Sequence, residues 1–350
     1  MKTIDVHASR HYQVLIGSDL LDHLGNYVTG LCKAAKVCIV SDSNVFPLYG
    51  KQAADSLTNA GLKVLEFVFP AGEESKNGST YLNILNFLAE NQITRTDCLI
   101  ALGGGVVGDL TGFAAATFLR GIPFIQVPTT LLAAVDSSVG GKTAIDLPAG
   151  KNLCGAFYQP HLVLCDTDTL NTLPPDIFRD GCAEVIKYGI LYDPALFSYL
   201  SDTGVNFQRE DVIARCVELK RDVVMEDEFD TGARMKLNLG HTIGHGVEAQ
   251  SQFTISHGKA VAIGMAIVAR AAQANGICSK ETMKQILTTI SGFGLPVNTE
   301  YSADDLYCSA LSDKKRSGGS VSLIVPAAIG DCRILPTPVE NIKSFIEAGL

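Results

Sequence analysis

The feature that most constrains this chain is an apolar run that ends at three consecutive glycines. Residues 98–102 are apolar, and Gly103, Gly104 and Gly105 follow them. Such a run is typical of a buried strand that meets a tight turn, and glycine there lets a ligand approach the backbone closely. The apolar stretch after Asp109 predicts a helix, whose N-terminus would direct free N–H groups and a positive dipole at a phosphate. The segment therefore predicts a site for a phosphorylated ligand, and we interpret that ligand as a dinucleotide.

Five short apolar runs in the first half of the chain alternate with helical patterns. The runs cover residues 37–40, 63–69, 98–102, 124–127 and 162–165, and each ends in a turn. This alternation implies a parallel sheet with crossover helices, whose ligand sites lie beyond the carboxyl ends of the strands. The standard Rossmann fingerprint is absent, because the best strand-end acid, Asp42, precedes the glycines, whereas the fingerprint has an acid about 20 residues after them.

The pattern changes near residues 170–176, where two prolines are adjacent. Beyond them, Val212, Cys216, Leu219 and Val223 follow helix spacing, and residues 260–274 predict a long helix of small residues. Residues 321–325 predict one late strand. We therefore expect an α/β fold with two domains: a Rossmann-like parallel-sheet domain over residues 1–171 and a mainly α-helical domain over residues 172–350.

Composition excludes two classes of partner. The formal charge of −9 argues against a nucleic-acid surface, which needs a basic footprint. The longest apolar helical stretch, residues 260–269, is bracketed by Lys259 and Arg270 and is too short to span a bilayer. The ten cysteines are scattered without a CxxC pair, and the sequence opens like a strand and not like a cationic apolar leader. We expect reduced thiols in a cytoplasmic protein.

Three of the seven histidines cluster in the second half of the chain, at His241, His245 and His257. His241 and His245 lie four residues apart, on one helical face, and Glu184 stands on an apolar helix with Lys187 one turn further on. Zinc favours histidine and carboxylate ligands, and a catalytic site uses three of them and keeps one position open. One histidine alone is more often a hydrogen-bonded core residue, but this concentration favours a metal centre. Spacing leaves open which two histidines bind, and His241 with His245 is the simplest choice.

Several cations are poorly placed for simple solvation. Lys142 and Lys151 stand in segments that we expect to be glycine-rich loops, Lys220 flanks an apolar stripe, Arg120 precedes a glycine, and Arg234 comes one turn before Asn238. Surface ion pairs or extended side chains that reach solvent would explain each one separately. In a net acidic chain, their clustering near a metal site favours a pocket for a polyanion.

These residues are the ones that carry a resemblance. Along nearly its whole length the chain resembles the 3-dehydroquinate synthase family, which is NAD- and zinc-dependent and typically homodimeric. The matching motifs are GGGVVGDLTGFAAATFLRGIPFIQVPTTLLAAVDSSVGGKTAIDLPAGKN at 103–152, AEVIKYG at 183–189, LNLGHTIGH at 237–245 and HGKAVAIGM at 257–265. The resemblance implies an NAD-binding first domain and a second domain that binds metal and substrate.

The resemblance also implies individual roles. Glu184, His241 and His257 would hold Zn²⁺, with Co²⁺ as a substitute, and His245 would be an acid/base group near the substrate. NAD would lie along Asp42, Asn44, Glu73, Lys76, Gly104, Gly105, Val106, Asp109, Thr129, Thr130, Lys142, Lys151, Thr169 and Thr172. The substrate would meet Asp136, Lys142, Asn152, Lys187, Lys220, Arg234, Asn238, His245 and Lys314, and Arg120 would reach into the neighbouring subunit's site.

The implied activity is that of a carbon–oxygen lyase acting on a phosphorylated keto acid. Such an enzyme converts 3-deoxy-D-arabino-heptulosonate 7-phosphate to 3-dehydroquinate and phosphate, the second step of chorismate and aromatic amino acid biosynthesis. The steps are transient oxidation by NAD, phosphate elimination, re-reduction, ring opening and intramolecular aldol closure. Three alternatives stay open: another sugar phosphate cyclase, a metal-dependent polyol dehydrogenase of the glycerol type, and an inactive NAD-binding regulator.

The sequence departs from the family pattern at three places. Lys259 stands where the family usually has glutamate, in HGEAV, which changes the charge beside the metal but removes no implied ligand. Asp146 stands where the family often has asparagine. Lys314 and Lys315 are adjacent, so the implied substrate contact falls on either of them.

Overall fold

The computed structural model describes residues 1–307 and 319–350, which form two compact units. The first unit comprises Met1–Pro174 and Arg209–Phe229, and the second comprises Pro175–Gln208 and Asp230–Leu350. The predicted boundary at 171/172 lies close to the first of these divisions. Helix α7 (Arg209–Glu226) groups with the first unit because it packs on β1 and β2, a long-range contact that sequence order does not reveal.

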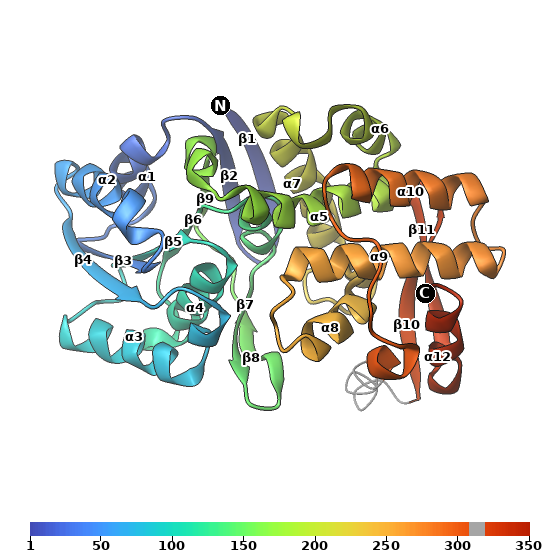
Figure 1. The fold of residues 1–350 in the computed structure, drawn as a ribbon. Helices are drawn as coiled ribbons and strands as arrows, with labels where there is room; N and C mark the ends of the chain where they lie inside the picture. Colours follow the sequence, from blue (N-terminus) through green and yellow to red (C-terminus); the bar gives the residue numbers. More distant parts are fainter. Residues whose placement is uncertain (308–318) are drawn as a thin grey trace. The chain divides into compact units, whose positions relative to one another are not determined.

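A seven-stranded sheet forms the centre of the first unit (Figure 1). Its strands are β1 (Lys2–His7), β2 (His11–Gly17), β3 (Lys36–Asp42), β4 (Lys63–Phe69), β5 (Cys98–Gly103), β6 (Phe124–Pro128) and β9 (Leu162–Asp166), in the order β1-β2-β9-β6-β5-β3-β4. Only the β1–β2 pair in this sheet is antiparallel. All five strands predicted in the first half are present, so the parallel-sheet prediction is confirmed.

The sheet is buried on both faces, which explains why its strands are continuous apolar runs. Val37 and Ile39 of β3 face a core that includes α1 (Leu24–Leu31) and α2 (Phe46–Asn59). Cys38 and Val40 face the opposite core, with α3 (Gly78–Glu90) and α4 (Gly105–Thr117). The chain leaves β3 toward β4 and leaves β5 toward β6, on opposite sides, so β3 and β5 flank a topological switch point. Parallel sheets bind ligands at such a point.

Two expectations for the glycine-rich region need correction. The helix after the glycines begins at Gly105, so Asp109 lies within its second turn and does not precede it. Lys142 and Lys151 stand in a β-hairpin, β7 (Lys142–Leu147) paired with β8 (Gly150–Phe157), and not in loops. The side chains of the hairpin alternate between buried and exposed only weakly. Its sequence therefore lacks the alternating apolar and polar pattern that predicts a strand.

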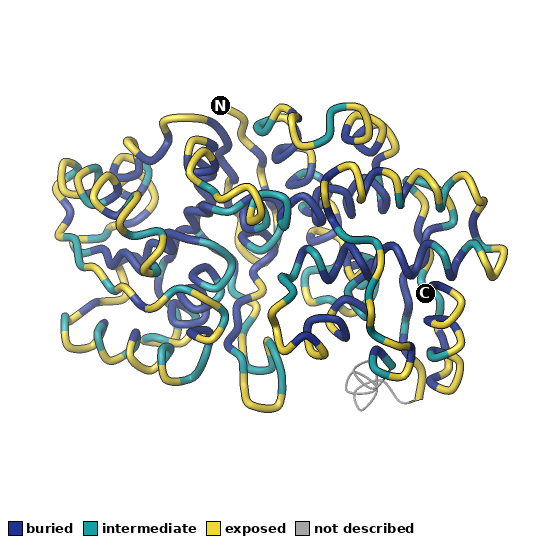
Figure 2. Tube along the Cα trace, viewed as in Figure 1, coloured by how far each residue is buried: buried dark blue, intermediate teal, exposed yellow. Residues whose placement is uncertain are grey.

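The second unit is mainly helical, as predicted, with one β-hairpin. Its elements are α5 (Pro175–Tyr192), α6 (Pro194–Thr203), α8 (His241–Gln250), α9 (His257–Ala274), α10 (Lys280–Gly292), β10 (Ser320–Ala328), β11 (Asp331–Pro338) and α12 (Val339–Glu347). Helix α9 is buried along most of its length (Figure 2), because it packs against α5, α8, α10, α12 and β10. The late strand was predicted, but its partner β11 was not.

Within the residues that the structure describes, no helix combines the length and apolar character needed to cross a membrane.

Candidate functional site

The turn between β5 and α4 offers exposed backbone at the carboxyl edge of the sheet. Gly104 is the N-cap residue of α4, and no side chain caps this end of the helix. A Cβ on Gly104 would lie 3.2 Å from Cγ2 of Thr130, and one on Gly105 would lie 3.2 Å from Oγ of Ser137. Larger residues would therefore fill the space beside the first turn. The uncapped N-terminus is suited to a phosphate group.

Other residues predicted to bind NAD lie at the ends of neighbouring strands. Asp42 ends β3, and its Oδ1 accepts hydrogen bonds from the amides of Asn44 (2.8 Å) and Val45 (3.0 Å), so it also shapes the turn before α2. Thr129 follows β6, and its Oγ1 is buried without a hydrogen-bond partner among the described residues. A buried hydroxyl without a partner costs stability, so Oγ1 of Thr129 is a group that a ligand atom at this edge could satisfy.

The turn after β9 completes this edge of the sheet. Thr169 and Thr172 lie in the 3₁₀ helix Thr167–Thr172. The hydroxyl of Tyr49, from α2, donates to the carbonyl of Thr169 (2.9 Å) and lies 2.5 Å from Oγ1 of Thr172. This contact holds the turn against α2.

A buried lysine connects several predicted residues. Lys76 Nζ forms an ion pair with Oδ2 of Asp109 (2.6 Å) and donates to Oδ1 of Asn152 (2.6 Å). Burial opposes protonation of Lys76, but Asp109 and Glu73 outweigh it and raise its pKa. Burial raises the pKa of Asp109, and the charge of Lys76 partly offsets that effect. Lys151 forms a longer pair with Glu73, at 3.6 Å.

Asn152 has a left-handed backbone conformation, with a φ of 56°. This conformation is uncommon for a residue with a side chain and indicates a constrained position. Oδ1 of Asp146 accepts its backbone N–H at 2.8 Å, so the residue that departs from the family's asparagine holds this turn. Because Oδ1 of Asn152 binds Lys76, its amide nitrogen is the group that can donate to a ligand.

Lys220 reaches from α7 to the π-helical turn Ala133–Ser137. It is 6% exposed, donates to the carbonyl of Asp136 at 2.6 Å, and forms a close ion pair with the carboxylate of Asp136. Because both charged groups are at most partly exposed, this contact is much less screened than a surface ion pair. The alternative of a solvated lysine is therefore wrong for Lys220.

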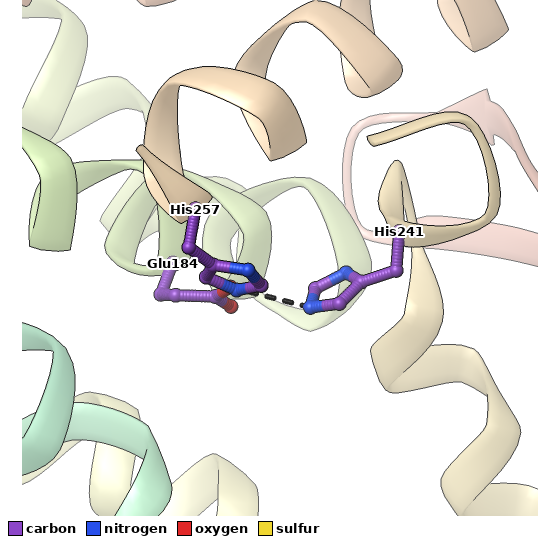
Figure 3. Close-up of side chains that lie close together, drawn as sticks. All are labelled: Glu184, His241 and His257. Atoms are coloured by element: carbon purple, nitrogen blue, oxygen red, sulfur yellow. Dashed lines mark hydrogen bonds and ion pairs between the residues drawn. The ribbon is translucent and has the colours of Figure 1, made fainter. Parts of the chain in front are cut away.

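Three side chains of the second unit converge on one point (Figure 3). Glu184 comes from α5, and His241 and His257 are the first residues of α8 and α9. Oε1 of Glu184 lies 3.4 Å from Nε2 of His241 and 3.2 Å from Nε2 of His257. Two imidazole nitrogens and a carboxylate are the donor set of a catalytic zinc site with an open position.

The outer nitrogen of each ring has its own partner. Nδ1 of His241 lies 3.1 Å from the carbonyl oxygen of Leu239, and Nδ1 of His257 lies 3.5 Å from Oε1 of Glu248. An Nδ1–H that donates to these oxygens leaves Nε2 as the lone-pair nitrogen on each ring. This is the arrangement that holds metal-binding histidines in place.

Close helix packing allows the two histidines to meet. Gly240, which precedes α8, has a φ of 79°, and Gly264 of α9 faces it. A Cβ on Gly264 would collide with the carbonyl oxygen of Gly240. Glycine at both positions therefore lets α8 and α9 approach closely.

Glu184 is buried in a charged environment. It is fully buried, and Lys187, 1% exposed, forms a close ion pair with its Oε2. Burial acts to raise the pKa of Glu184, but Lys187 and His241 outweigh it, so the pKa lies well below its usual value. Burial acts to lower the pKa of His257, but Glu184 and Glu248 raise it to about 10. Glu184 and Glu248 thus favour a positive charge between them. A bound metal ion would supply such a charge.

Glu248 is the residue that the sequence analysis missed. It forms a second possible metal group with His245 and His257. Glu248 lies seven residues after His241 and three after His245, a helical spacing that signals a shared face. No group of three among the described residues contains both His241 and His245, so the simplest choice from spacing is not the arrangement found.

The remaining predicted residues fall at scattered positions. Arg234, 2% exposed, and Asn238 lie in the 3₁₀ helix Ala233–Asn238, which leads into α8. Lys142 is exposed at the start of β7, and Arg120 is exposed with a φ of 70°. Lys314 lies outside the described residues.

Comparison with known proteins decides the family. Residues 66–180 match the model described as 3-dehydroquinate synthase N-terminal, and residues 181–316 match 3-dehydroquinate synthase C-terminal. The chain belongs to the 3-dehydroquinate synthase family. The 3-dehydroquinate synthase of Pelobacter propionicus is 46% identical over 342 residues, with 95% of each chain covered. That of Enterococcus faecalis is 43% identical over 341 residues, covering 96% of this chain and 95% of the relative.

Solved structures of two other synthases are similar to this chain over nearly its whole length. A 2-deoxy-scyllo-inosose synthase, complexed with carbaglucose-6-phosphate, NAD⁺ and Co²⁺, is 27% identical with a TM-score of 0.90 over 100% of both chains. The 2-epi-5-epi-valiolone synthase ValA of Streptomyces hygroscopicus subsp. jinggangensis 5008, with NAD⁺ and Zn²⁺ bound, is 26% identical with a TM-score of 0.89 over 98% of both. A probable glycerol dehydrogenase from Sinorhizobium meliloti 1021 shares only the fold, at 13% identity and a TM-score of 0.68, with 96% and 95% covered.

Proposed function

We propose that this chain converts 3-deoxy-D-arabino-heptulosonate 7-phosphate to 3-dehydroquinate and phosphate, as a carbon–oxygen lyase of aromatic biosynthesis. One observation carries the proposal: Glu184, His241 and His257 converge in a chain whose two halves both match 3-dehydroquinate synthase models. The relatives above 40% identity bear that name, which disfavours the other sugar phosphate cyclases, at 26–27% identity.

The residues of the first unit fit NAD. The uncapped N-terminus of α4, with glycine at positions 104 and 105, suits the pyrophosphate. The buried Oγ1 of Thr129 needs a hydrogen-bond partner, which the cofactor would supply. Lys76 and Lys151 balance the negative charges of Asp109 and Glu73. The proposed NAD site is the full set named from the resemblance: Asp42, Asn44, Glu73, Lys76, Gly104, Gly105, Val106, Asp109, Thr129, Thr130, Lys142, Lys151, Thr169 and Thr172.

The residues of the second unit fit a divalent cation. Glu184, His241 and His257 would hold Zn²⁺, with Co²⁺ as a substitute, because their donor atoms are of the preferred types and two of them are oriented by outer partners. When bound, NAD would supply a hydride acceptor and the cation a Lewis acid.

The chain's own residues bind and orient the substrate. Lys142, Lys220, Arg234 and Lys314 would stabilise the carboxylate and phosphate charges, and Asn152 would donate its amide N–H groups. Lys187 neutralises Glu184 and keeps the carboxylate ionised. His245, exposed on α8, would exchange a proton with the substrate. Asp136 and Asn238 would hold substrate hydroxyls.

Assembly and location belong to the same proposal. We infer a homodimer in which Arg120 contacts the partner's site. Leu119 and Arg120 both have positive φ values, of 51° and 70°, and exposed side chains. Such strained backbone is typical of functional positions. We place the enzyme in the cytoplasm, where we expect the nine cysteines of the described residues to be reduced thiols.

The test follows phosphate release by the purified protein with NAD and the heptulosonate phosphate, with and without a chelator, while NADH absorbance is recorded. We expect metal-dependent phosphate release without net NADH. In the Glu184→Ala variant, both metal retention and phosphate release should be lost. Accumulating NADH would indicate a polyol dehydrogenase, and no phosphate release from this substrate would refute the assignment.

A further inference from the structure

Helix α9 begins without the cap that its own sequence could provide. Ser256 occupies the N-cap position, but its side chain forms no hydrogen bond to the helix backbone. The third helical residue is Lys259, which cannot complete a capping box because that motif needs glutamate or glutamine there. The first turn of α9 therefore needs an acceptor from outside the helix.

Asp180 of α5 supplies that acceptor. Its Oδ1 accepts the backbone N–H of Lys259 at 3.1 Å and the hydroxyl of Ser256 at 2.5 Å. An N-cap side chain normally accepts the N–H of the third residue, so Asp180 performs this function from another helix. Its negative charge also lies at the positive end of the α9 dipole.

The same contact joins two parts of the metal centre. Asp180 lies one turn before Glu184 on α5, and the helix end that it caps begins with His257. Gly258 permits the contact, because a Cβ there would lie 2.8 Å from Cα of Asp180 and would collide with its carbonyl oxygen. One face of α5 thus carries Glu184 and fixes the first turn of α9.

We propose that Asp180 is a positioning residue of the metal centre, which fixes His257 against Glu184 by capping α9 in place of the Ser256 side chain. The inference rests on the proposed function, since it takes Glu184, His241 and His257 as the metal ligands. Without Asp180 the first turn of α9 frays, and binding of the metal must first order His257. Metal affinity then falls although every ligand is present.

The experiment measures Zn²⁺ affinity of the full chain by competition with a chromophoric chelator, and the visible spectrum of the Co²⁺ form. Asp180→Ala should weaken Zn²⁺ binding roughly tenfold, the lower end of the effect of losing an outer-shell partner. Asp180→Asn should bind nearly as tightly as the original chain, because the amide oxygen still accepts both hydrogen bonds.

A double variant tests the capping mechanism itself. Lys259→Glu in the Asp180→Ala background creates the sequence S-x-x-E of a capping box. In that motif the Ser256 side chain accepts the N–H of residue 259, and the glutamate accepts the N–H of Ser256. The double variant should therefore restore most of the lost Zn²⁺ affinity. The same Lys259→Glu change alone should give no gain, because it places a second carboxylate beside Asp180. This difference between the two backgrounds distinguishes a cap from a general effect of charge near the metal.

A matched control separates positioning from stability. Asp193 caps α6 by accepting the amides of Ala195 and Leu196, both at 3.0 Å. Asp193→Ala should lower the unfolding temperature about as much as Asp180→Ala and leave Zn²⁺ affinity and the Co²⁺ spectrum unchanged.

Each result has a defined meaning. Unchanged affinity in Asp180→Ala, or failure of Lys259→Glu to restore a lost affinity, would overturn the positioning role. A Co²⁺ spectrum altered in Asp180→Ala and recovered in the double variant would support it. Retention of Zn²⁺ by His257→Ala would instead refute the proposed metal site, so the two failures can be told apart.

Discussion

Glu248 provides the sharpest test of how the metal centre is built. The described residues contain two candidate groups that share His257, one with Glu184 and His241 and one with His245 and Glu248. In the first group Glu248 only orients His257 through Nδ1, and in the second it is a ligand. The change Glu248→Gln separates these roles, because it removes the charge and keeps the shape of the side chain.

The expected magnitude follows from the contact. Glu248 is 3% exposed and its Oε1 lies 3.5 Å from Nδ1 of His257. Loss of an outer partner typically costs about 10–100-fold in metal affinity, or about 1.4–2.8 kcal/mol at 1.4 kcal/mol per tenfold. Glutamine still offers an accepting oxygen, so Glu248→Gln should lower Zn²⁺ affinity about tenfold. Glu248→Ala removes that oxygen and should lower the affinity about a hundredfold. Both variants should still bind one Zn²⁺ per chain.

The assay is a Zn²⁺ titration of these variants beside His241→Ala. Glu218→Gln serves as the control, since Glu218 is 39% exposed and pairs with Arg215 on α7. We expect His241→Ala to lose the site and Glu218→Gln to keep full affinity. The opposite pattern, in which Glu248→Gln abolishes stoichiometric binding and His241→Ala retains it, would refute the assignment of Glu184 and His241 as ligands.

Two further predictions concern other parts of the chain. His245→Ala should keep one Zn²⁺ per chain and slow phosphate release by roughly 10²–10⁴-fold, the range of a lost acid/base group; loss of zinc, seen by metal analysis, would mean that His245 is a ligand. Asp97 accepts the amides of Ala35, Lys36 and Thr94, at 3.1, 2.8 and 2.7 Å. Burial acts to raise its pKa, but these hydrogen bonds outweigh it and the pKa is lowered. Its stabilisation is therefore full above the unfolded-state pKa of about 3.9 and is lost as pH falls through the folded-state value. Denaturant unfolding should show that Asp97→Asn lowers the free energy of unfolding by about 1.5–3 kcal/mol at pH 7. The difference in unfolding free energy between the variant and the original chain should narrow below about pH 4. A difference that stays constant down to pH 3 would contradict this.

The sheet could be predicted because its strands are locally distinctive. A strand covered on both faces is a short apolar run, and residues 98–102 ended at glycines as β5 does at Gly103. The hairpin β7–β8 lacks such a run, because its buried residues are confined to positions 143–145 of β7. The prediction of glycine-rich loops at these positions is wrong, because strand pairing is a contact that neither strand encodes alone.

The candidate metal centre was only partly accessible to local reasoning. Helix spacing put His241 and His245 on one face of α8 and favoured them as a pair, but no candidate group of three among the described residues contains both. Nothing local indicates that α9 begins at His257, three residues before the apolar pattern starts, or that its first turn meets Glu184. The choice of His241 and His257 with Glu184 came from the resemblance to the family motifs and not from the spacing of the residues. Glu248 could have been found, since it continues the face that carries both histidines of α8.

The departure at Lys259 shows how a motif difference can act through structure. Read along the sequence, it is a change of charge two residues after a proposed ligand. In the structure Lys259 stands at the third position of α9, where Asp180 of α5 accepts its backbone N–H and also binds the hydroxyl of the N-cap residue Ser256. The two residues are 79 positions apart, so sequence order does not reveal their contact. If the cap is what matters, Asp180→Ala alone should bind its metal less well than either the original chain or the double variant that also carries Lys259→Glu, because only the single variant lacks a cap at the start of α9.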